Sequence, residues 1–119
     1  MPIALQHERD NVYRLELRGT LQRGDFQRCQ KLLADEMQHR GAVRLLFILD
    51  RFDGWDPNDD WSDLTFYVRH GSSIERIAIV GPERWRGETL MFAGADLRKA
   101  PVEFFVEGRT DAARAWLVD

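Results

Sequence analysis

The chain contains a single cysteine and has no long hydrophobic run. Cys29 therefore has no intramolecular disulfide partner, as is typical of proteins that fold in a reducing compartment. The longest apolar stretch, residues 45–49, is far shorter than the ~20 residues of a membrane-spanning helix. The first ten residues contain neither a basic start nor an apolar segment of the kind that directs export. We therefore expect a cytoplasmic protein.

An excess of charge of one sign is also lacking. The 119 residues include 17 Lys and Arg against 20 Asp and Glu, and the net charge of −3 gives no overall attraction to nucleic acid. Hydrophobic residues at 44% and charged residues at 31% lie near the averages of globular proteins. This length and composition predict one globular domain over residues 1–119, without a nucleic-acid partner.

Catalytic and metal-binding residue types occur without the spacing that their chemistry requires. The histidines are far apart in sequence, and helix capping already explains several of the clustered acids. Cys29 falls on the apolar stripe of an expected helix, where a thiol usually acts as a small core residue. The sequence has no nucleophile elbow and no phosphate-binding loop. We expect no catalytic residue, metal or cofactor, and hence not an enzyme. These histidines and clustered acids are His7, His39, His70, Asp50, Asp53, Asp56, Asp59, Asp60 and Asp63.

Hydrophobic periodicity predicts alternating strands and helices after an opening hairpin. Residues 3–7 and 12–18 alternate apolar and polar side chains and predict two antiparallel strands. The apolar run 45–49 is typical of a central strand covered by helices on both faces. The other expected elements are helices over residues 25–40, 57–69, 85–92 and from 110 onward, and strands over residues 74–80 and 102–106. The order ββαβαβαβα predicts an α/β fold: a mixed, mostly parallel sheet of about five strands with four helices.

Capping residues and one apolar stripe define the expected helices further. Asp56 is expected to cap helix 57–69, and Thr110 is expected to cap the last helix. Phe66 falls off the apolar stripe that helical periodicity predicts for helix 57–69. That stripe consists of Trp61, Leu64, Thr65 and Val68.

Aromatic and glycine residues near the two central strands carry a family resemblance. They include Phe52-Asp53-Gly54-Trp55 after strand 45–49, then Trp61, and then Trp85 after the strand that ends at Gly81. Phe104-Phe105 and residues 113–117 fit the same pattern. In these features the sequence resembles the bacterial SpoIIAA-like family over nearly its whole length. The resemblance implies an architecture related to the STAS domains of anti-sigma-factor antagonists and to the lipid-carrying CRAL-TRIO domains.

The phosphorylation motif of those antagonists is not present. They carry a phosphorylatable serine in an Asp-Ser-Ser/Thr-Gly motif that opens the helix after the central strand. This chain has residues 53–57, Asp-Gly-Trp-Asp-Pro, at that place, and Ser62 falls about one turn inside the expected helix. The resemblance therefore does not imply a phosphoserine switch here.

Aromatic residues that follow the central strands form the predicted binding site. Open α/β sheets bind ligands at the carboxyl ends of their strands, so the rings are expected to line one crevice there. The alternative, that the rings only pack as core, stays open for every one of them. The predicted ligand-binding residues are Phe52, Trp55, Trp61, Trp85 and Phe92.

The leading functional hypothesis is a non-enzymatic domain that binds an apolar or amphipathic small molecule, such as a lipid, between the second and third helices. Arg51, Arg84 and Arg86 are candidate cations for an anionic head group, or are simply solvated. Movement of residues 53–61 would open the crevice, and exposed rings would contact a membrane surface transiently. The alternative is a STAS-like protein-interaction module that docks another protein, or a second copy as a homo-oligomer.

Overall fold

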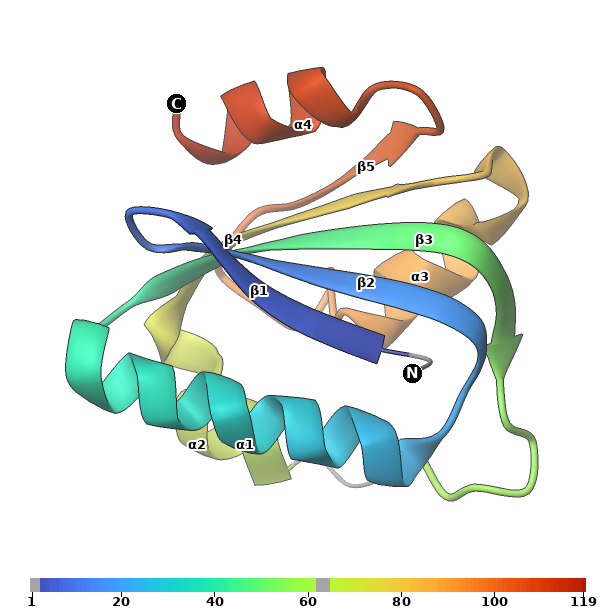
Figure 1. Cartoon of the computed structure of the whole chain (residues 1–119), viewed down its shortest axis with the longest axis horizontal. Coiled ribbons are helices and arrows are strands. Elements are labelled where there is room, and N and C mark those ends of the chain that lie inside the picture. The colour runs from blue at the N-terminus through green and yellow to red at the C-terminus, as the bar shows by residue number, and fades with distance from the viewer. Residues whose placement is uncertain (1–2, 62–64) are drawn as a thin grey trace.

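The structure is a computed structural model that describes residues 3–61 and 65–119. In this part of the chain five strands form one sheet in the order β1-β2-β3-β4-β5, with helices on both faces (Figure 1). The strands are β1 (Ile3–Arg9), β2 (Val12–Leu21), β3 (Val43–Trp55), β4 (Ile74–Gly81) and β5 (Val102–Val106). The helices are α1 (Arg23–Arg40), α2 (Thr65–His70), α3 (Arg86–Phe92) and α4 (Thr110–Leu117), with short 3-10 turns at Gly71–Ser73 and Glu83–Trp85.

The sheet topology confirms the predicted fold class. β1 and β2 are antiparallel, and Ile3 lies opposite Leu17 in the hairpin. The pairs β2-β3, β3-β4 and β4-β5 are all parallel, as expected for strands joined through helical crossovers. β3 lies at the centre of the sheet, where the apolar run 45–49 placed it.

Two apolar cores cover the two faces of the sheet. The larger core lies under α1, α2 and α3, and the smaller lies under α4 alone (Figure 1). Arg44 and Arg76, from β3 and β4, donate hydrogen bonds to the carbonyl oxygens of Leu117 and Trp116 at the end of α4. Because a helix C-terminus carries partial negative charge, these two cations help to hold α4 on the sheet.

The second helix is shorter than predicted. Residues 57–61 are not helical, and α2 begins at Thr65. The Asp56 side chain accepts the backbone N–H of Asn58 at 2.9 Å, so it stabilises a turn and does not cap a helix there. The expected apolar stripe was wrong at Val68, which is 77% exposed, whereas Phe66, expected off the stripe, is half-buried against the larger core. Ser62, Asp63 and Leu64 lie outside the described residues.

The last helix begins where the sequence indicates but is capped differently. Thr110 is the first residue of α4, and the N-cap position belongs to Arg109. No side chain hydrogen-bonds to the backbone as a cap at this helix start. The prediction of Thr110 as the capping residue was therefore wrong by one position.

Strand β3 is longer than the apolar run predicted, and its second half is irregular. Its pairing with β2 shifts register before Phe52 and again before Trp55. Within this stretch Arg51 adopts a φ of 53°, a left-handed conformation that is uncommon for residues other than glycine. Such irregularities bend a strand and re-aim its side chains. Phe52 and Trp55 therefore lie on the strand itself, and the expectation that these residues come after the strand was wrong.

Candidate ligand-binding cavity

The five predicted aromatic residues are brought together into one cluster. Phe52 lies 5.1 Å from both Trp55 and Trp85, measured between ring centroids. Phe92 connects Trp55, at 5.2 Å, to Trp61, at 5.8 Å. Three of these four contacts are edge-to-face, a geometry in which aromatic pairs attract each other, and the fourth is tilted. The cluster joins the end of β3 and the loop after it to both ends of α3, since Trp85 directly precedes this helix and Phe92 is its last residue.

A cavity of about 510 Å³ lies beside this cluster, between α1 and α3 on the face of the larger core. Only three of the predicted residues line it: Trp55, Trp61 and Phe92. Phe52, which is 2% exposed, and Trp85 pack behind the cavity wall. Part of the aromatic cluster therefore packs as core, and the other part faces the cavity.

Much of the cavity wall was not predicted. Phe26 of α1 contacts both Trp61 and Phe92, at 6.3 and 5.0 Å between ring centroids, and Phe66 of α2 also lines the space. Phe26 stood on the apolar stripe of its helix, so the sequence indicated that it faces the sheet but not that a space lies there. The floor is aliphatic and buried, and it includes Leu15, Leu33, Leu45 and Ile77.

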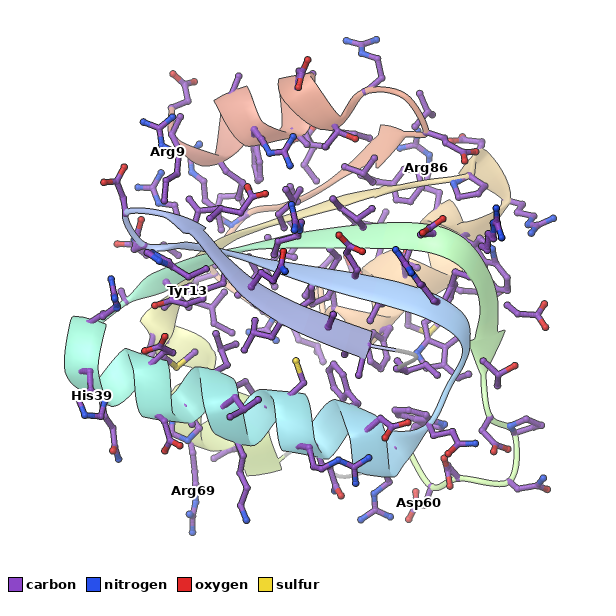
Figure 2. All side chains as sticks on the ribbon, viewed as in Figure 1. Arg9, Tyr13, His39, Asp60, Arg69 and Arg86 are labelled. Atoms are coloured by element: carbon purple, nitrogen blue, oxygen red, sulfur yellow. The ribbon has the colours of Figure 1, made fainter. Side chains whose placement is uncertain are left out.

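Polar side chains occupy other parts of the cavity lining. Arg23, Gln27 and Gln30 come from α1, whereas Glu88 comes from α3 and Arg98 from the segment after it. Asp60 also lines the cavity, and Figure 2 places it near the N-terminal end of α1. The cavity therefore combines an apolar floor with hydrogen-bonding and charged groups, which is a common design of small-molecule sites.

The loop that follows β3 is tied to neighbouring elements. The backbone N–H of Asp56 donates to the carbonyl oxygen of Leu21 at 2.9 Å, and the indole N–H of Trp61 donates to the carbonyl oxygen of Asp56 at 3.1 Å. By contrast, the buried indole nitrogens of Trp55 and Trp85 have no hydrogen-bond partner in the described structure. Because an unpaired buried donor is costly, an acceptor brought close to Trp55 would be stabilised.

Cys29 lies in the cavity wall and is 5% exposed. Burial raises the pKa of its thiol to about 11, so the reactive thiolate is scarce at neutral pH. The side chain therefore serves as an apolar wall residue, as its place on the helix stripe indicated. Among residues 3–61 and 65–119, no three His, Cys, Asp or Glu side chains are grouped so that they could hold a metal ion.

The arginines considered for an anionic head group lie elsewhere. Arg86 forms an ion pair with Glu83 and lies over the ring of Phe104, and Arg84 lies over the ring of Trp85. Arg51 is exposed on β3. None of Arg51, Arg84 and Arg86 lines the cavity, whose arginines are instead Arg23 and Arg98.

The five-stranded α/β sheet with its covering helices is a SpoIIAA-like fold, and this fold suggests a regulatory or binding module. The sequence pattern of the SpoIIAA-like family matches residues 12–118, and the chain belongs to this family, whose members are generally non-enzymatic. The fold is also that of a crystal structure of an uncharacterised protein from Shewanella loihica PV-4, described as having a SpoIIAA-like fold. The two share 21% identity with a TM-score of 0.72, over 97% of this chain and 91% of that one. No curated protein matches the sequence.

In the part of the chain described, no helix has the length and apolar character needed to cross a membrane.

Proposed function

We propose that this domain binds an apolar or amphipathic small molecule of lipid type in the cavity between α1 and α3. The observation that carries the proposal is the space of about 510 Å³ over a floor of buried aliphatic side chains. This volume falls within the range of small-molecule sites in proteins. The sequence hypothesis placed the ligand between the second and third helices, and the proposed site adds α1 as its main wall.

The aromatic residues have distinct roles in this proposal. Trp55, Trp61 and Phe92 contact the ligand, whereas Phe52 and Trp85 hold Trp55 in position from behind. Trp61 is tied to the loop after β3 through Asp56, so movement of this loop would widen the cavity on that side. Burial of apolar ligand surface in the cavity supplies the driving force, at about 25 cal/mol for each Å² removed from water.

The first experiment is native mass spectrometry of the purified protein beside an organic extract of the same sample. We expect a co-purifying amphiphile that is lost in Trp55→Ala and in Trp61→Ala. The matched control is Trp116→Ala, because Trp116 packs on the opposite face of the sheet against the smaller core. Titration with the neutral apolar dye N-phenyl-1-naphthylamine, excited through tryptophan, gives a second measurement that needs no natural ligand. Equal dye binding by wild type and both cavity variants would contradict the proposed site.

A protein-interaction module is the second candidate. Met91 and Leu97 both line the cavity and are 77% and 66% exposed, so apolar side chains stand at its open side. Exposed apolar groups of this kind would suit a protein partner, a second copy of the chain or transient contact with a membrane surface. Analytical ultracentrifugation of wild type and Met91→Gln/Leu97→Gln distinguishes the two candidates. A ligand-free dimer that the double substitution dissociates would favour the interaction module.

A further inference from the structure

The charged groups that line the cavity differ in their burial according to sign. Arg23 and Arg98 are half-buried, whereas Asp60 and Glu88 are exposed. Charges that are well solvated interact weakly with a ligand because water and salt screen them, but half-buried charges are screened less. Water and salt therefore screen the two positive charges of the lining less than the two negative ones.

Arg23 and Arg98 differ in the partners that their guanidinium groups already have. The Arg98 Nε donates to the carbonyl oxygen of Ala93 at 2.6 Å, and this hydrogen bond holds the side chain at the C-terminal end of α3. Arg23 is held at its backbone, where its N–H donates to Oδ2 of Asp59 at 2.8 Å. No carboxylate in the described residues forms an ion pair with the Arg23 guanidinium. Arg23 is therefore the cation with capacity for a further anionic partner.

Gln27 orients the Arg23 side chain. With its amide oxygen turned toward Arg23, it accepts from Nε at 3.1 Å and from Nη2 at 3.3 Å. A guanidinium carries five N–H donors, so the contact with Gln27 leaves other donors of Arg23, a cavity-lining residue, for a further acceptor. Gln27 and Gln30 stand at positions i and i+3 of α1 and therefore lie on the same side of the helix. They add neutral hydrogen-bonding groups to the same wall of the cavity.

We infer that the cavity selects amphiphiles with one anionic head group, a carboxylate or a phosphate monoester, that Arg23 binds. This inference rests on the proposed function. The apolar tail lies on the floor formed by Leu33, Leu45 and Ile77, and the head group lies at the N-terminal part of α1. A charge-assisted hydrogen bond to a guanidinium is stronger than one between neutral groups, so an acid binds more tightly than the alcohol of the same chain length.

The test compares decanoate, decyl phosphate and decanol as competitors of bound N-phenyl-1-naphthylamine. For wild type we expect the better of the two anions to compete about tenfold more strongly than decanol. Arg23→Gln should remove most of that preference, measured within the variant as the ratio of competition by each anion to competition by decanol. Arg28→Gln is the matched control, since Arg28 is an exposed α1 arginine that pairs with Asp25 and does not line the cavity. The comparison of the two anions identifies the head group.

The outcomes separate this inference from the proposed function. Equal competition by decanol and both anions in wild type would overturn the selectivity for acids but leave the cavity as a binding site. A preference that survives in Arg23→Gln, or that Arg28→Gln removes equally, would overturn the role of Arg23. If neither the dye nor any competitor binds wild type, both proposals fail. Thermal unfolding of each variant checks that the fold is retained.

Discussion

Asp59 accepts the backbone N–H of Arg23 at 2.8 Å through its Oδ2 atom, and thereby caps helix α1 from a loop 36 residues further along the chain. The residue before the helix, Gln22, provides no side-chain cap of its own. A carboxylate at this place satisfies one of the unpaired N–H groups of the first turn and interacts favourably with the helix dipole. The contact also ties the loop after β3 to one wall of the cavity.

The first prediction concerns this cap. Asp59→Ala should lower the free energy of unfolding by about 1 kcal/mol, the usual effect of losing a capping side chain. Urea denaturation followed by far-ultraviolet circular dichroism measures the loss. Asp59→Asn should keep part of the stability, because the amide oxygen still accepts the hydrogen bond.

Asp53→Ala is the control for this substitution, since Asp53 is an exposed acid on β3. The control should leave stability nearly unchanged. If Asp59→Ala and Asp53→Ala have the same effect, the capping role is wrong.

The same contact shows which parts of the structure can be predicted from sequence. The hairpin follows from local alternation of apolar and polar residues, and β4 follows from a mostly apolar run. β5 begins and ends where the sequence predicts. Asp59 belongs to an acidic stretch that local rules assign to the start of the second helix. Its actual partner, Arg23, lies far away in sequence, so only the tertiary arrangement reveals the pairing.

The candidate site divides in a similar way. Its aromatic residues could be selected from sequence because they follow the two central strands. Which of these rings pack as core and which line the cavity could not be predicted from sequence. The irregular backbone around Arg51 decides the directions in which the Phe52 and Trp55 side chains point. The contribution of Phe26 depends on the position of α1 over the sheet, which no local pattern gives.

The second prediction concerns the pH dependence of stability. Glu8 of β1 accepts two hydrogen bonds from Arg114, from Nε at 3.1 Å and from Nη2 at 2.8 Å, and a third from Arg14 at 3.1 Å. Chiefly through the hydrogen bonds from Arg114, and against the effect of burial, the pKa of Glu8 is lowered below its ordinary value of 4.5. A carboxylate with a lowered pKa stabilises the fold above its ordinary pKa, and this contribution is lost as pH falls through the lowered value.

Glu8→Gln should therefore reduce the free energy of unfolding by on the order of 2 kcal/mol at pH 7. The difference from wild type should stay constant down to about pH 5 and shrink at lower pH. Denaturation series between pH 3 and pH 7 measure this profile, with Glu107→Gln as the control at an exposed position. A difference between wild type and Glu8→Gln that does not change with pH would contradict the role of the carboxylate charge.

The third prediction uses the cavity as a source of stability. Cys29→Leu adds apolar volume to the cavity wall, and we expect it to raise the free energy of unfolding by about 1 kcal/mol. The same substitution should weaken dye binding, because it occupies ligand space. Ala113→Leu makes a similar change in the smaller core, where Ala113 is 0% exposed and does not line the cavity beside Cys29.

Overpacking should make Ala113→Leu destabilising by about 1 to 3 kcal/mol. A rise in the free energy of unfolding for Cys29→Leu together with a fall for Ala113→Leu would support an accessible cavity beside Cys29. Destabilisation by both, with dye binding unchanged, would show that the space beside Cys29 does not accept added atoms.

The fourth prediction concerns the close approach of β3 to Trp85. Gly54 has a φ of 94°, and a Cβ atom placed there would lie 3.2 Å from the Trp85 ring. Gly108 has nearly the same φ, 93°, but a Cβ atom there would meet nothing within 4 Å. Substituting each glycine with alanine therefore separates the effect of backbone strain from the effect of the ring contact. Gly108→Ala should cost about 1 kcal/mol through strain alone.

Gly54→Ala carries the same strain and also displaces Trp85, so it should cost about 2 to 3 kcal/mol. Because Trp85 lies 6.0 Å from Trp55 between ring centroids, the displacement should change tryptophan fluorescence and weaken dye binding in the cavity. Gly108→Ala should change neither. Equal unfolding free energies for the two variants would mean that the ring moves aside without cost, and Trp85 would then have no part in positioning the wall residue Trp55.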